Sequence, residues 1–242
     1  MRLFSWLILL ACSAGAAAQD KTESRELIGK VGTRDALLVL HAMERADGSW
    51  QVAGEYILLR TLARRFVVGE RSPELGVTVL KEGTTPILYG RPPTGELRGT
   101  WRDGSFKGTR YGPGGQKREE FEFGDAFASM DAYSARVRCE ADEGRYRSHL
   151  DLAVESGQLK KLEWRATEPG GQSCNVVASE QQTLPGGLRF AAGACRITLR
   201  DVGEFVALRA ENCAAQCTGE AYLEPILVDR RGNCELLRYG PR

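Results

Sequence analysis

The sequence predicts an all-β protein made of two antiparallel β domains: a meander barrel or sandwich, then a domain stabilised by disulfides. Short apolar segments recur about every ten residues in the first half, separated by glycine, proline and aspartate, which is typical of antiparallel meanders. Of the seven cysteines, six fall in the second half; these are Cys139, Cys174, Cys195, Cys213, Cys217 and Cys234. An even set of cysteines behind an export signal favours disulfides.

The amino-terminal segment predicts export. Residues 1–18 combine a positive charge at Arg2, a short apolar stretch and small residues in an A-x-A pattern, so we expect signal-peptide cleavage after Ala18. An alternative is lipoprotein processing at Cys12. The apolar stretch is shorter than the roughly 20 residues that a transmembrane helix needs. The predicted location is therefore the periplasm or the extracellular medium, without a transmembrane segment, and lipid anchoring at Cys12 is the alternative.

The net charge limits the classes of partner that the protein can attract, and the length limits the number of domains. The chain has 33 basic and 32 acidic residues, and loss of the leader removes Arg2, which leaves 32 of each. No field of one sign remains to attract nucleic acid or an anionic membrane. The length and the uneven distribution of cysteines predict a barrel-like domain at 19–124, a linker or short helix at 125–132 and a cysteine-rich domain at 133–242.

The first half is expected to form a series of short strands. They are 36–43, 50–59, 65–69, 76–81, 85–89, 96–101, 106–111 and 118–123. Asp47 and Gly48 predict a two-residue hairpin turn between the first two. That turn would place four residues of the first strand on one apolar face with four of the second; these are Leu37, Val39, His41 and Met43 with Leu58, Tyr56, Gly54 and Val52.

This register suggests a ligand site inside the barrel. His41 would lie on the apolar face opposite Gly54, where the missing side chain leaves space, and Tyr56 would lie beside them. A core histidine with one satisfied hydrogen bond is the alternative interpretation. His41, Gly54 and Tyr56 are therefore the candidate binding residues.

The second half is expected to contain strands at 133–139, 145–155, 159–167, 196–200 and 204–210. Strand 145–155 alternates strictly, which predicts one buried face and one solvated face that carries His149. A turn at Ser156-Gly157 would place Cys139 opposite Cys174, and a turn at 201–203 would bring Cys213 near Cys195. Cys217 and Cys234 then remain as the third pair, and other connectivities stay open.

The chain shows no recognisable catalytic or metal-binding motif. It lacks a nucleophile elbow, a zinc-protease helix, a phosphate-binding loop and a calcium loop. A zinc site at Cys213 and Cys217 would need further ligands, and the chain has two histidines. We therefore predict no catalytic residues, no metal and no cofactor. Paired carboxylates that meet only in space stay open, so whether the protein is an enzyme is not decided.

Two short motifs resemble known barrels. Gly99-Thr100-Trp101 is similar to the G-x-W strands of small up-and-down β-barrels, and Gly54-Glu55-Tyr56 is similar to strand segments of exported bacterial barrel-like proteins. In the second half, the strand pair 150–154 and 159–164 and the tail 212–234 resemble a group of uncharacterised exported proteobacterial β domains.

The second half also bears a looser likeness to the periplasmic inhibitors of C-type lysozyme, without their S-G-x-x-Y loop. The leading hypothesis is an exported, disulfide-stabilised binding protein whose ligand is unknown. One alternative, implied by this likeness, is an inhibitor or protector that acts on a cell-wall hydrolase such as lysozyme. Another is an envelope glycan hydrolase. The partner is therefore expected to be an envelope component or a cell-wall hydrolase.

Overall fold

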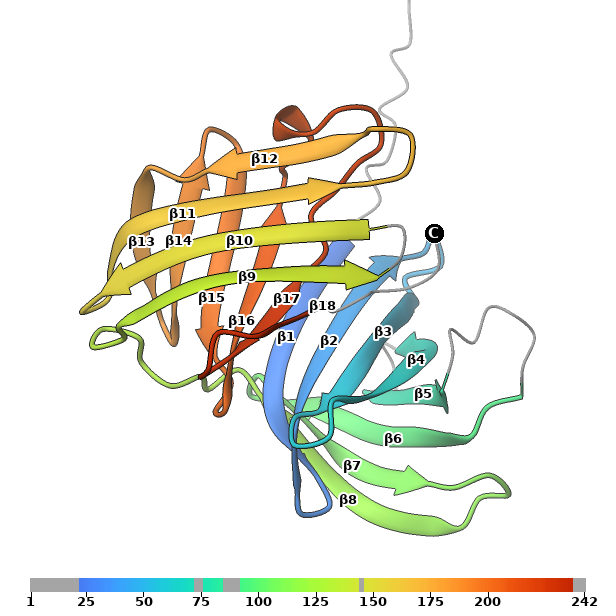
Figure 1. The fold of residues 1–242 in the computed structure, drawn as a ribbon. Coiled ribbons are helices and arrows are strands. Elements are labelled where there is room, and N and C mark those ends of the chain that lie inside the picture. Colours follow the sequence, from blue (N-terminus) through green and yellow to red (C-terminus); the bar gives the residue numbers. More distant parts are fainter. Residues whose placement is uncertain (1–21, 72–75, 85–91, 144–145, 237–242) are drawn as a thin grey trace, which may run out of the picture.

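A computed structural model describes residues 22–71, 76–84, 92–143 and 146–236 (Figure 1). The protein is all-β, as predicted, and its first half is a closed eight-stranded antiparallel barrel in sequential order. The barrel strands are β1 (Thr22–Val31), β2 (Arg34–Glu44), β3 (Trp50–Leu58), β4 (Ala63–Arg71), β5 (Val77–Gly83), β6 (Gly95–Arg102), β7 (Ser105–Tyr111) and β8 (Lys117–Gly124). The predicted leader, Cys12 and the strand expected at 85–89 lie outside the described residues.

The barrel closes because β1 pairs with both β2 and β8. Residues Ile28–Val31 of β1 pair with Phe121–Gly124 of β8, so the first and last strands complete the wall. Alternate residues of each strand point inward and form one apolar core, which includes Leu38, Leu80 and Phe106. The strand β1 is not among those expected from the sequence.

The β2–β3 hairpin differs from the predicted register by one residue. The backbone N–H of Arg45 donates to the carbonyl of Ser49, and Gly48 has a φ of 78°, so the loop has three residues and ends in a left-handed glycine. His41 therefore pairs with Ala53, and Leu40 pairs with Gly54. Because a shift of one residue exchanges the two faces of a strand, the prediction that His41 shares a face with Gly54 and Tyr56 was wrong.

Gly54 is required by a close approach of two strands. A Cβ placed on Gly54 would lie 2.0 Å from the carbonyl oxygen of Val39, a backbone atom that cannot rotate away. We expect Gly54→Ala to lower the free energy of unfolding by about 1–3 kcal/mol, because the strands must separate to admit the methyl group. Chemical denaturation measures this. Gly124→Ala is the matched control, since its Cβ would meet only Ser105 Oγ at 3.5 Å, and equal losses in the two variants would contradict the prediction.

The second half consists of two antiparallel sheets. The four-stranded sheet, in the order β12-β11-β10-β9, comprises β9 (Ala135–Glu143), β10 (Tyr146–Glu155), β11 (Gln158–Thr167) and β12 (Ser173–Val177). The six-stranded sheet, in sequential order, comprises β13 (Glu180–Leu184), β14 (Gly187–Ala192), β15 (Cys195–Asp201), β16 (Phe205–Glu211), β17 (Ile226–Asp229) and β18 (Cys234–Leu236). A 3-10 turn, η2 (Ala214–Gln216), precedes Cys217.

The two sheets enclose a single apolar core between them. Trp164 is fully buried there, and its indole N–H donates to Ser148 Oγ at 2.8 Å. The predicted buried face of the 145–155 strand is confirmed, because the even-numbered residues from Tyr146 to Val154 are all buried. The strands β12, β13, β14, β17 and β18 are not among those expected from the sequence.

Three disulfides stabilise this half, which confirms that all six cysteines are paired. They are Cys139–Cys234, Cys174–Cys217 and Cys195–Cys213. The predicted Cys195–Cys213 pair is confirmed, and the pairs Cys139–Cys174 and Cys217–Cys234 were wrong. Cys139 lies on β9 and Cys174 on β12, which are the opposite edges of the four-stranded sheet. The predicted pairing failed because β9 is a separate strand that is antiparallel to β10. Cys139 therefore lies opposite Leu150 and is not a continuation of the β10–β11 hairpin.

A third apolar cluster joins the barrel to the six-stranded sheet. Outward-facing residues of β1–β3 pack against the face of this sheet that points away from the sandwich core; the cluster includes Leu37, Val39, Ile57, Phe205, Ala207 and Leu227. The linker after β8 is not helical: Ala128 forms an isolated bridge with Asp201, and Phe127 packs into the cluster. The six-stranded sheet is thus covered on both faces.

Candidate functional site

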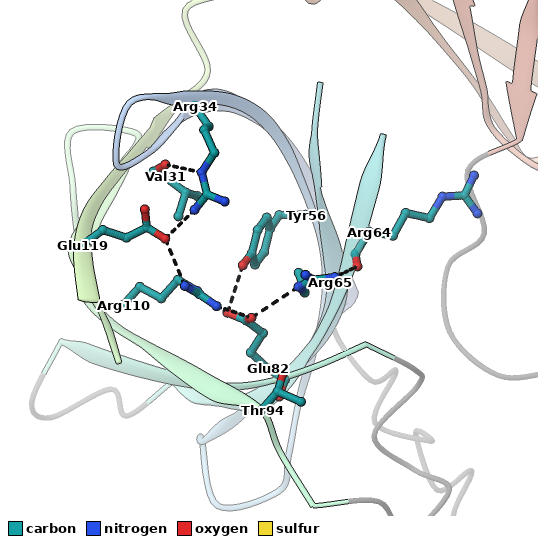
Figure 2. Close-up of polar contacts among 9 residues, drawn as sticks. All are labelled: Val31, Arg34, Tyr56, Arg64, Arg65, Glu82, Thr94, Arg110 and Glu119. Carbon is teal, nitrogen blue, oxygen red and sulfur yellow. Dashed lines mark hydrogen bonds and ion pairs between the residues drawn. The ribbon is translucent and has the colours of Figure 1, made fainter. Parts of the chain in front are cut away.

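One end of the barrel lumen holds a network of charged side chains (Figure 2). Glu82 of β5 is fully buried, and Arg110 of β7 donates to it twice, from Nε at 2.7 Å and from Nη2 at 2.8 Å. The Tyr56 hydroxyl donates to the same carboxylate at 2.9 Å, and Arg65 Nε lies 3.6 Å from it. The carboxylate compensates the cost of burying Arg110, and it raises the pKa of that guanidinium through a direct hydrogen bond.

A second glutamate extends the network to the wall. Glu119 of β8 accepts from Arg110 Nη1 at 3.0 Å and from Arg34 Nη2 at 2.5 Å. The chain of contacts therefore crosses the barrel from β3 to β8 and ends on β2. Tyr56, Arg65 and Arg110 are the kind of groups that would bind a ligand carboxylate, but Glu82 already occupies the place between them. This end of the lumen is closed by the protein's own side chains.

A cleft of about 620 Å³ lies on the outside of the barrel, beyond the apolar cluster that joins it to the six-stranded sheet. Its floor is formed by residues at one end of β1, β2 and β3, and its wall is formed by the end of β16. The lining residues are Thr22, Glu23, Ser24, His41, Ala42, Met43, Gln51, Ala53, Arg209, Glu211 and Asn212. The small side chain of Ala53, directly opposite His41, helps to leave this space open.

Arg209 links the two walls of this cleft. Its guanidinium donates to Ser24 Oγ at 2.6 Å and to Glu211 at 2.5 Å, and it lies 3.8 Å from Glu26. Arg200 of β15 approaches Glu26 from the other side at 3.6 Å. Burial raises the pKa of Glu26, and the two arginines oppose this shift. Charged contacts therefore tie β1 to the six-stranded sheet beside the cleft.

Ser24 and His41 lie side by side on the cleft floor. Ser24 Oγ is 3.0 Å from His41 Nδ1, and both residues are exposed to solvent. Desolvation in the cleft and the positive charge of Arg209 lower the pKa of His41, although Glu211 opposes them. This shift favours the neutral imidazole, which has one acceptor nitrogen and one donor nitrogen.

Glu55, a buried glutamate on the outer face of β3, does not line this cleft. Glu55 is fully buried, and neither of its carboxylate oxygens has a hydrogen-bond partner among the described residues. Burial raises the pKa of Glu55 to about 8; the charge of Arg64 opposes this shift, and that of Glu224 adds to it. Arg64 points away from the lumen (Figure 2), as Glu55 does.

The structure does not bring the three candidate binding residues together. Tyr56 and Gly54 face the lumen, where Tyr56 contacts Glu82, whereas His41 faces the outside and lines the cleft. His149 is on the predicted solvated face of β10, with Nδ1 3.5 Å from Glu140.

In the described ranges, no three histidine, cysteine, aspartate or glutamate side chains are grouped to hold a metal ion. Nor do these ranges contain a helix of sufficient length and apolarity to cross a membrane.

Ser24, Arg209 and Glu211 were missed from the sequence. They are far from His41 along the chain, and Arg209 comes from the other half of the protein. Alternation on β16 was the available signal, since Arg209 and Glu211 follow Phe205 and Ala207 on the same face.

Compared with protein-family models, with curated proteins and with solved structures, the chain gives no significant match.

Proposed function

We propose that this chain is an exported binding protein that takes a small, uncharged polar ligand in the cleft between the barrel wall and β16. The observation that carries the proposal is that polar side chains from both halves of the protein line one cleft. Its volume of about 620 Å³ lies within the range of about 300–1,000 Å³ that is usual for ligand sites. It also lies where two parts of a protein meet, a common place for such sites.

The lining favours a ligand with hydroxyl or amide groups. Thr22, Ser24, His41, Gln51 and Asn212 offer hydrogen-bond donors and acceptors. The charged lining residues are already paired within the protein; these are Glu23 with Arg25, and Glu211 with Arg209. A charged ligand would have to compete with these pairs, whereas a neutral one would use the remaining polar groups. A mono- or disaccharide fits this chemistry and size.

Two features support export. The three disulfides are typical of proteins that fold in an oxidising compartment, such as the periplasm or the extracellular medium. The leader-like segment at residues 1–18 agrees with them.

The proposal predicts that filling the cleft abolishes binding. Ligand-observed NMR with a panel of neutral saccharides, with matched uronic acids and amino sugars, identifies what binds. We expect a neutral member to bind, and Ala53→Phe to weaken its binding at least tenfold, because the ring occupies the space opposite His41. Ala153→Phe, on the outer face of β10, is the matched control and keeps binding. Saccharide binding that survives in Ala53→Phe, or no binding by any neutral member, contradicts the proposal.

A further inference from the structure

The cleft floor holds a serine and a histidine that strand pairing fixes opposite each other. Ser24 of β1 and His41 of β2 are direct partners in the antiparallel register, so their side chains leave the sheet on the same face. Their contact at 3.0 Å is therefore set by the paired backbones of two barrel strands and not by a loop. Both side chains are exposed to the cleft.

The direction of the hydrogen bonds follows from the chemistry of Arg209. A guanidinium is a donor only, so Ser24 Oγ accepts from Arg209 Nη2 at 2.6 Å. The hydroxyl proton of Ser24 is then directed to His41 Nδ1, which accepts it. Arg209 also places a positive charge beside Oγ, where it stabilises negative charge that develops when the proton leaves.

We infer that Ser24 is a nucleophile, that His41 is its general base, and that the cleft accepts the acyl group of a small carboxylic ester. This inference rests on the proposed function, since the ester must enter the same cleft. It adds a covalent step to binding. Arg209 acts through Ser24 and is a positioning residue.

The step balances with these residues and water. Ser24 Oγ attacks the carbonyl carbon of the ester, and its proton passes to His41 Nδ1. The tetrahedral intermediate collapses, the bond to the alcohol oxygen breaks, and the leaving alkoxide takes the proton from His41. An acyl ester on Ser24 remains. A water molecule then attacks this ester while His41 Nδ1 takes its proton. The bond between the acyl carbon and Ser24 Oγ breaks, Oγ takes the proton back from His41, and the acid is released.

The charges around His41 keep it in the form that a base requires. Arg209 and Glu211 face it from β16, while β3 contributes the uncharged Gln51 and Ala53. Desolvation is the largest cause of the lowered pKa of His41; the positive charge of Arg209 adds to it, and Glu211 opposes it. The reaction rate is therefore expected to rise with pH and to reach half its plateau below pH 6.5.

A short-chain fluorophosphonate tests the inference on the full mature chain. Attack of Ser24 on phosphorus expels fluoride and leaves a stable ester, which intact mass and peptide mapping locate. We expect one adduct on Ser24, none in Ser24→Ala, and labelling about 100-fold slower in His41→Gln. Hydrolysis of p-nitrophenyl acetate should follow the same order. His149→Gln and Ser49→Ala are matched controls that keep the wild-type rate, and circular dichroism confirms that every variant is folded.

The absence of an adduct on Ser24 in excess probe, or equal labelling rates in wild type and His41→Gln, would overturn the inference. Other outcomes would distinguish failure of this inference from failure of the proposed function. If neutral saccharides bind to the wild type and to Ser24→Ala, but not to Ala53→Phe, and Ser24 takes no adduct, then the cleft binds a ligand without reacting with it. Adduct formation on Ser24 that depends on His41, without any saccharide binding, would retain the reactive pair and reject the saccharide class.

Discussion

Glu82→Ala is expected to destabilise the protein by about 3–5 kcal/mol, since removing one member of a buried ion pair leaves the other uncompensated. The carboxylate of Glu82 accepts two hydrogen bonds from Arg110 and one from the Tyr56 hydroxyl. Tyr56 is 1% exposed, so its hydroxyl cannot turn to bulk water when the carboxylate is lost. The whole network at this end of the lumen then loses the group that holds it together.

Urea denaturation followed by tryptophan fluorescence measures this loss. Trp50 and Trp101 report on the barrel, and a Trp164→Phe background removes the signal of the sandwich core. Glu122→Ala is the matched control, because Glu122 is 65% exposed in its pair with Lys107, and exposed pairs contribute about 0–1 kcal/mol. If Glu82→Ala were as mild as this control, the network would not be what stabilises this end of the barrel.

Smaller changes separate the contributions within the network. Tyr56→Phe removes one hydrogen bond and leaves the ion pair, so we expect a loss of about 1 kcal/mol. Replacing both partners, as Glu82→Leu with Arg110→Met, removes both buried charges and should recover part of the loss. A double variant less stable than Glu82→Ala would show that shape, and not charge, dominates here.

The strand pattern of the barrel was predictable because the alternation of apolar residues is local. Most expected strands agree with the structure to within one to three residues at each end. The register of the first hairpin was not predictable in the same way, since Asp47-Gly48 fits both a two-residue and a three-residue loop. Because of this ambiguity, the predicted register placed His41 in the lumen, whereas the structure places it in the cleft. The strand β1 was missed because its inward positions include Arg25 and Gly29, which weakens the apolar signal.

The candidate site was less predictable than the fold because it depends on pairings far apart in the sequence. Arg209 meets Ser24 across a separation of 185 residues, and Cys139 meets Cys234 across 95. Alternation places each of these residues on a face, but it does not say which face packs against which. The six-stranded sheet is covered on both sides, and only the tertiary structure shows that its second cover is the barrel wall.

Glu55→Gln is expected to stabilise the protein at alkaline pH. Glu55 is fully buried and its oxygens accept no hydrogen bond from the described residues, so the ionised form is disfavoured in the folded state. Its pKa is raised from 4.5 to about 8, chiefly by burial. Arg64 lowers this pKa and Glu224 raises it, and the effect of burial is larger than either.

The sign of the pH dependence follows from the protons that each state binds. Between pH 4.5 and about 8 the folded protein keeps the proton on Glu55, while the unfolded chain has released it. The unfolded state is therefore favoured progressively as pH rises through this window, and the contribution of Glu55 to stability is lost. Glutamine has nearly the same shape and no proton to release, so this loss is absent from the variant.

Chemical denaturation of both proteins at pH 4 and pH 8 tests this argument. At pH 4 the two should be equally stable, because Glu55 is protonated in both states. At pH 8 we expect the variant to be more stable by about 4–5 kcal/mol, since each unit between the folded and unfolded pKa values corresponds to about 1.4 kcal/mol. Glu70→Gln, whose side chain is 61% exposed, is the control and should show no such difference. A gain that is equal at both pH values would mean that Glu55 has the same pKa in the folded and unfolded states, and that burial does not raise it.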